Sequence, residues 1–138
     1  LYHRSRRSAP IPAEGVATTC RVHVPADGGV LSLELGYLRP RAALPGTQLV
    51  AEISVVAGDE RRRLHYEPMR VVPARTEQRQ QPFERLDLPL SRWAGRDVDI
   101  ELRTRLFGAG AAHPLDWMGF AMAYRDARVQ ARPGGARP

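Results

Sequence analysis

Hydrophobic and polar residues alternate along most of the chain. In the clearest segment, residues 97–107 (DVDIELRTRLF), Val98, Ile100 and Leu102 alternate with charged residues. A period of two places every second side chain of an extended segment on one face, so this pattern predicts a half-buried strand of an antiparallel sheet. No segment shows the period of about 3.6 residues that indicates a convincing amphipathic helix.

The same alternation recurs between turn sequences that are rich in Gly, Pro and Asp. It predicts further strands at residues 16–24, 30–35, 47–57, 83–90 and from about 115 to 124, with a possible extension to 129. A weaker segment, residues 61–72, is interrupted by Pro68. Seven or eight short strands separated by turns are typical of an all-β antiparallel sandwich.

The length and the two chain ends suggest one domain with tails. A chain of 138 residues is long enough for one core and too short for two domains. We predict a β-sandwich over residues 14–129, preceded by a basic, Pro-punctuated tail or linker (1–13) and followed by a disordered Arg/Pro/Gly tail (130–138).

The net charge of +6 resides in the ends of the sequence. Residues 8–124 contain 14 Arg and 14 acidic residues, so they are neutral overall. The chain has no Lys and no Asn, which fits a GC-rich bacterial genome better than selection for phosphate contacts. We therefore predict no specific nucleic-acid binding, and basic tails that are solvated or near a membrane.

The single cysteine and the length of the apolar stretches do not point to a particular function. Cys20 cannot form an internal disulfide, and we predict that it is a small buried hydrophobe on the face shared by Val16 and Val22. One cysteine does not reveal the redox compartment. No apolar stretch reaches the roughly 18–20 residues that a membrane-spanning helix needs.

The segment from Phe83 to Phe120 resembles the C-terminal half of galactose-binding-like jelly-roll domains. The matching positions are Phe83, Leu86, Leu88, Trp93, Ala94, Gly95, Val98, Ile100, Leu102, Thr104, Asp116 and Trp117. The resemblance implies a jelly-roll sandwich. It also implies roles known in that family: sugar-binding modules, accessory domains of glycoside-active enzymes, and extracytoplasmic domains of membrane-anchored envelope proteins.

Physical reasons for part of this motif are independent of the family. Gly95 permits a positive φ at a tight reversal, and Trp93 can close one end of the sandwich as a plug. We therefore interpret both residues as determinants of the fold.

The sequence contains no recognisable catalytic or metal-binding motif. Its four histidines, at positions 3, 23, 65 and 113, lack metal-ligand spacing, and there is no GxSxG segment. Asp97, Asp99 and Glu101 alternate with apolar residues, which predicts a solvated strand face. We predict no metal, no cofactor and no enzymatic activity of this chain alone, although it can belong to a larger enzyme.

The resemblance points to loop residues for ligand binding, because such modules combine an aromatic ring with charged side chains. The candidates are Tyr37, Arg39 and Arg41 on one loop, and His113 and Asp116 on another. Two structural alternatives stay open: Tyr37 caps the core, or Asp116 holds its loop through backbone hydrogen bonds. The triplet at residues 61–63 is either a solvated strand start or a basic contact for acidic glycans or phospholipid headgroups.

These observations favour a non-catalytic binding or accessory domain for carbohydrate or a cell-envelope polymer. We expect it to be extracytoplasmic, periplasmic or at the cell surface, and part of a larger or membrane-tethered protein. One alternative is a structural interaction domain whose basic tails dock on an acidic partner protein or anionic lipid. Another is a hydrolase with a cleft that the sequence does not reveal.

Overall fold

The computed structural model describes residues 2–4, 15–38, 46–70, 83–108 and 121–131. These residues form eight strands and one 3₁₀ turn, η1. The strands are β1 (Tyr2–Arg4), β2 (Val16–His23), β3 (Val30–Leu38), β4 (Gln48–Ala57), β5 (Glu60–Arg70), β6 (Glu84–Pro89), β7 (Asp97–Phe107) and β8 (Ala121–Gln130), with η1 (Ser91–Trp93) between β6 and β7.

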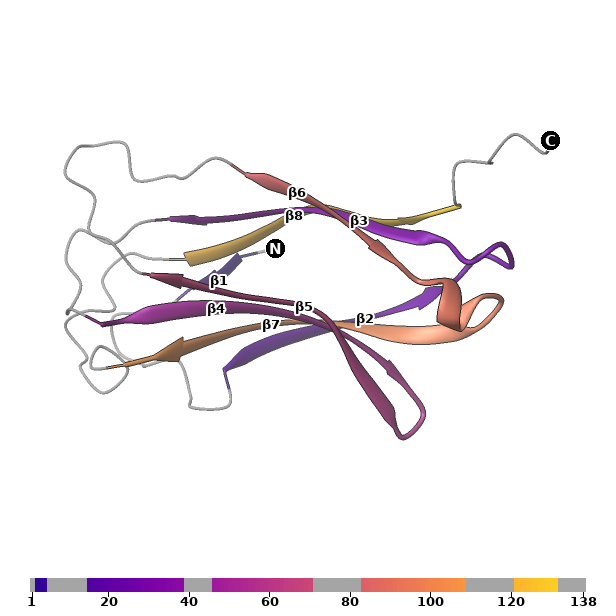
Figure 1. Cartoon of the computed structure of the whole chain (residues 1–138), viewed down its shortest axis with the longest axis horizontal. Coiled ribbons are helices and arrows are strands. Elements are labelled where there is room, and N and C mark those ends of the chain that lie inside the picture. Colours follow the sequence, from indigo (N-terminus) through magenta and orange to yellow (C-terminus); the bar gives the residue numbers. More distant parts are fainter. Residues whose placement is uncertain (1, 5–14, 39–45, 71–82, 109–120, 132–138) are drawn as a thin grey trace.

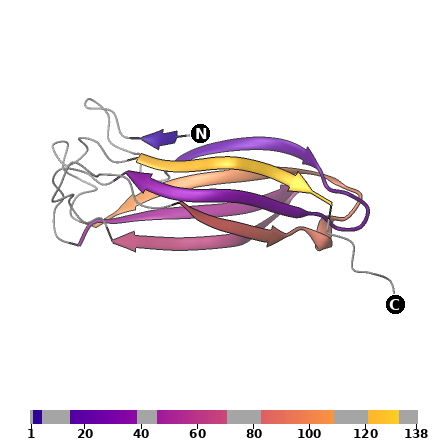
Figure 2. The same cartoon turned by 90° about the horizontal axis from the view of Figure 1, so that it is seen from above.

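The strands form two four-stranded antiparallel sheets, which lie face to face (Figures 1 and 2). One sheet has the order β1-β8-β3-β6 and the other the order β2-β7-β4-β5. The first strand thus pairs with the last, the second with the seventh, the third with the sixth and the fourth with the fifth. A long hairpin rolled up in this way is a jelly roll, so the predicted fold class is confirmed.

The core lies between the two sheets and follows the predicted alternation. In β7, buried and more exposed residues alternate from Val98 to Leu106. Leu33, Ile53 and Leu102 are among the residues of the single hydrophobic cluster that the two inner faces supply. Because each strand contributes every second side chain, the cluster has the thickness of one side-chain layer from each sheet.

The turn between β6 and β7 closes one end of the sandwich. Trp93, at the end of η1, is only 2 % exposed and belongs to the core cluster. Gly95 has φ 71°, and its amide donates to the carbonyl oxygen of Val24 at 3.0 Å. This glycine takes the left-handed conformation that the reversal requires. Trp93 and Gly95 therefore lie where the sequence predicted them, as the plug and the turn at this end of the sandwich.

Two segments differ from the expectations. Residues 2–4, inside the predicted tail, form β1 and pair with β8 over residues 121–123. The interrupted segment is a full strand, β5, which contains Pro68 and lies at the edge of its sheet. An edge strand accommodates proline because one side of its backbone needs no ladder hydrogen bonds.

Cys20 corrects another prediction, because its side chain is exposed. It lies on edge strand β2 and lines a small cleft of about 80 Å³ between β2 and β8, together with Val22 and Val129. The pattern placed Cys20 on the correct face. That face stays partly open because, among the described residues, no strand pairs with the outer edge of β2.

The outer face of β4 is also covered. Glu52 and Ser54 are buried there, although they point away from the core. Arg61 and Arg105 lie across Glu52, with ion-pair distances of 3.3 and 3.6 Å. Long arginine side chains therefore shield this sheet face in the way that apolar residues would elsewhere.

The acidic residues of β7 lie on this same outer face, but the prediction that the face is solvated is wrong at Glu101, whose side chain is only 12 % exposed under the arginines. Glu101 accepts hydrogen bonds from Arg61 at 2.6 Å and from Arg103 at 2.8 Å. Asp97 contacts His23 Nδ1 at 2.7 Å. In the part of the chain that the structure describes, no helix is long and apolar enough to cross a membrane.

Candidate functional site

A β-bulge in β8 creates an irregular outer face on the β6-β3-β8 sheet. The pairs that flank it are Ser32 with Arg128 and Glu34 with Arg125. Between these pairs, one residue of β3 lies opposite two residues of β8. Asp126, in the bulge, has φ 52°, the left-handed region in which aspartate is tolerated better than most residues. The extra residue lets two arginines three positions apart occupy the same face of the sheet.

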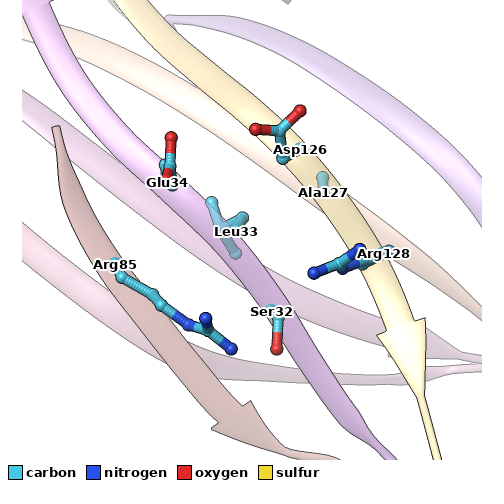
Figure 3. Close-up of a pocket in the computed structure, with 7 residues that line it drawn as sticks. All are labelled: Ser32, Leu33, Glu34, Arg85, Asp126, Ala127 and Arg128. Carbon is cyan, nitrogen blue, oxygen red and sulfur yellow. The ribbon is translucent and has the colours of Figure 1, made fainter.

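A hollow of about 280 Å³ lies over this bulge. Its lining comes from three strands: Ser32, Leu33 and Glu34 of β3, Arg85 of β6, and Asp126, Ala127 and Arg128 of β8. Figure 3 shows Arg85 and Arg128 extending from the two flanking strands toward Ser32, with Glu34 and Asp126 toward the other end. Guanidinium donors and carboxylate acceptors therefore border one hollow.

The end of the hollow at Ser32 is held by one hydrogen bond between β3 and β6 and by another within β6. The Ser32 hydroxyl donates to Asp87 Oδ1 at 2.5 Å, and Arg85 Nε donates to Asp87 Oδ2 at 3.2 Å. The hydrogen bond from Ser32, assisted by Arg85, lowers the pKa of Asp87 below its ordinary value. Asp87 thus remains an anion that positions Arg85 beside the hollow.

The other end is fixed by Arg125. Its Nε donates to Glu34 Oε2 at 2.7 Å, and its guanidinium carbon lies 4.2 Å from the centre of the Phe83 ring. Phe83 in turn covers Gly36, where an added Cβ would lie 2.9 Å from Phe83 Cδ1. Glycine at position 36 therefore allows the ring to lie flat against the sheet, and the ring supports Arg125.

The charges around the hollow balance. Three arginines and three carboxylates border or support it: Arg85, Arg125, Arg128, Glu34, Asp87 and Asp126. A guanidinium donates two parallel hydrogen bonds, and a carboxylate accepts two. Such a set matches a neutral ligand with neighbouring hydroxyl groups.

Of the five ligand residues expected from the sequence, the structure describes one. Tyr37 is 4 % exposed, belongs to the core cluster, and its hydroxyl donates to the carbonyl oxygen of Arg70 at 3.4 Å. Tyr37 therefore lies where the structural alternative placed it, as a cap of the core. Its buried ring does not form a platform for a ligand. Arg39, Arg41, His113 and Asp116 lie outside the described residues.

The residues of the hollow were not singled out from the sequence. Arg125 and Arg128 were counted as part of a basic chain end, whereas both belong to β8. The departure from period two in "YRDARV" was a signal, because Tyr124 and Val129 fit one face only if an extra residue lies between them. Among the described residues, no group of three His, Cys, Asp or Glu side chains is placed to hold a metal ion.

Comparisons with known proteins add little to this geometry. No family model and no curated protein matches the chain. Among solved structures, it is similar to that of infectious bursal disease virus Gx strain, with 14 % identity and a TM-score of 0.40 over 84 % of this chain and 27 % of that chain. For the structure of infectious bursal disease virus Gt strain, the identity is 14 % and the TM-score is 0.36, over 85 % of this chain and 26 % of that chain.

This chain therefore spans about a quarter of the length of those viral chains. The resemblance of residues 83–120 to galactose-binding-like modules stays a prediction.

Proposed function

We propose that this chain is a non-catalytic binding domain for neutral saccharides, and that the hollow over β6, β3 and β8 is its binding site. The observation that carries this proposal is the convergence of Arg85, Arg128 and Glu34 around one hollow. Sugar hydroxyls both donate and accept, so they can engage guanidinium and carboxylate groups at once. The balanced charge favours a neutral sugar over a polyanion.

The size of the hollow supports recognition of one unit of a polymer. Its volume of about 280 Å³ is below the range of about 300–1,000 Å³ that is typical of small-molecule pockets. A glycan chain can place one sugar there while its neighbours lie along the sheet. This geometry suits an accessory domain of a larger extracytoplasmic or membrane-tethered envelope protein, the setting that the galactose-binding-like resemblance implies.

The carboxylates of the site support binding rather than hydrolysis. A general acid in a glycosidase needs a raised pKa, so that it carries a proton near neutral pH. The pKa of Asp87 is lowered instead, chiefly by the hydrogen bond from Ser32. Glu34 is ion-paired with Arg125.

The test is binding of neutral oligosaccharides to the protein and to two matched variants, measured by calorimetry. Arg85→Ala removes a donor from the hollow, and Arg21→Ala removes an exposed arginine from β2 in the other sheet. A hydrogen bond to a charged group contributes about 1.5–3 kcal/mol, so we expect Arg85→Ala to weaken binding about tenfold or more. Arg21→Ala should bind as the parent does.

The proposal fails if Arg85→Ala and the parent bind every tested saccharide equally. Binding that is restricted to sulfated or uronate-rich glycans and vanishes at high salt would replace the neutral ligand with an acidic one. Turnover of the glycan during the measurement would favour the hydrolase hypothesis.

A further inference from the structure

A groove lies at the side of the sandwich that is bordered by the edge strands β5 and β6. β5 and β6 each have one strand neighbour among the described residues, β4 and β3 respectively, and their free edges lie side by side (Figure 2). A groove of about 470 Å³ runs between β5 and the segment from the end of β6 to η1. Its walls combine basic and apolar side chains: Arg62, Arg63, Arg92, Leu64, Leu88 and Pro89.

A β-bulge in β5 places Arg62 at this groove. The register with β4 shifts between Ile53 and Ser54, so Leu64 is an extra residue. Arg62 then pairs with Val55, whose side chain is in the core. Paired residues of an antiparallel ladder share a face, so Arg62 extends from the core-side face of β5. It is nevertheless exposed, because β5 is an edge strand.

The groove carries an excess of positive charge. Arg92 is ion-paired with Glu60 at 2.9 Å, and the guanidinium carbon of Arg63 lies 4.6 Å from the centre of the Tyr66 ring. Arg63 pairs with Ser54, so its guanidinium lies on the outer face of β5. Within the described ranges, the Arg62 side chain has no ion pair or hydrogen bond. At the groove, the guanidinium groups of Arg62 and Arg92 are therefore offset by one carboxylate, that of Glu60.

Trp93 adds a buried hydrogen-bond donor at the same place. Its side chain contributes to the wall of the groove, and its Nε1 is buried without a hydrogen-bond partner among the described residues. Buried indole N–H groups normally have an acceptor, so this orphan is consistent with an acceptor supplied from outside.

We propose that this groove is a docking site for an extended acidic peptide segment of a partner protein. Carboxylates of the peptide would pair with Arg62 and Arg92. The alternate apolar side chains would pack on Leu64 and Leu88, and the free strand edges would bind the peptide backbone. An apolar floor and open strand edges favour a peptide over a glycan. This surface is separate from the saccharide hollow, because no residue lines both.

The test uses short synthetic peptides of alternating glutamate and valine, with binding to the full chain followed by calorimetry and tryptophan fluorescence. We expect Arg62→Glu to weaken binding about tenfold or more, and increasing salt to weaken it progressively. Arg21→Glu is the matched control, because Arg21 is an exposed arginine on β2, the opposite edge of the same sheet, and it should change affinity by less than about twofold. Arg62→Gln repeats the test without introducing a negative charge.

Two control peptides separate the contributions of charge and apolar surface. A lysine and valine peptide should not bind, and a glutamate and serine peptide should bind more weakly than the glutamate and valine peptide. The saccharide affinity of Arg62→Glu should equal that of the parent, so failure here is distinguishable from failure of the hollow.

The proposal is overturned if Arg62→Glu and Arg62→Gln bind the acidic peptide as the parent does. Self-association of these variants with unchanged peptide binding would assign Arg62 to protection of the sheet edge instead. Arg62-dependent binding to phosphatidylserine vesicles, without peptide binding, would identify a lipid surface as the ligand.

Discussion

Truncation of Trp93 tests whether the turn between β6 and β7 is a structural plug. The side chain is 2 % exposed within the core cluster. A tryptophan that buries about 200 Å² at about 25 cal/mol per Å² stabilises the fold by at most about 5 kcal/mol. Large-to-small truncation of a core aromatic residue costs about 3–5 kcal/mol. We therefore expect Trp93→Ala to lower the free energy of unfolding by that amount.

The assay is thermal and urea unfolding followed by circular dichroism, with Trp93→Phe as the matched variant. For a domain of this size, a loss of about 3–5 kcal/mol corresponds to a decrease in Tm of about 10–20 °C. Phenylalanine keeps an aromatic ring in the core and removes the buried Nε1 that has no described partner. Its cost should therefore be smaller, about 1–2 kcal/mol, because no unpaired donor remains buried.

An unchanged unfolding midpoint for Trp93→Ala would refute this reasoning. If saccharide or peptide binding were lost at the same time, Trp93 would be a ligand platform and its burial would not contribute to the fold. A loss in Trp93→Phe as large as in Trp93→Ala would show that Nε1 has a partner that the folded domain needs.

Three further predictions concern stability. Tyr124→Phe should cost about 1–3 kcal/mol in chemical denaturation, because the buried hydroxyl contacts Thr104 Oγ1 at 3.0 Å and donates to the carbonyl oxygen of Arg103 at 2.9 Å. The hydrogen bond from Arg103 lowers the pKa of Glu101, so its contribution is present above the ordinary value of 4.5 and is lost as pH falls through the lower folded value. Melts between neutral and acidic pH should show this loss, and Arg103→Gln should reduce the slope. Gly95→Ala should cost about 1–2 kcal/mol in Tm-derived stability from its φ of 71° alone, since an added Cβ meets no atom within 4 Å.

The acid-linked prediction would be contradicted by equal pH dependence in the parent and in Arg103→Gln. For Tyr124, an unchanged midpoint in the phenylalanine variant would mean that water replaces both hydrogen bonds. For Gly95, a loss far above the expected range would indicate a contact that the turn makes in solution.

The strands were predictable because their signal is local. In β7, the alternation that places Val98 and Ile100 inward depends only on neighbouring residues and on the geometry of an extended chain. The turn at Gly95 was predictable for the same reason, since a positive φ is a property of the residue and its two peptide units. These local rules identify the all-β class and most strand positions.

Pairing between distant segments decided what the pattern did not show. The three residues of β1 are a strand only because β8 lies beside them, and Cys20 is exposed because β2 is an edge strand among the residues that the structure describes. Tyr37 was predicted to lie on a loop, yet β3 extends to Leu38 and the rolled topology buries the Tyr37 side chain.

Both candidate sites depend on tertiary structure in the same way. The hollow joins Ser32, Arg85 and Arg128, which come from three strands and meet only when β3 lies between β6 and β8. The basic groove joins Arg62 and Arg92 across the gap between two sheets. The sequence determines which face of its own strand each side chain occupies. Sheet order and the two bulges determine which other side chains it meets, because register between strands is set by the packing of the whole core.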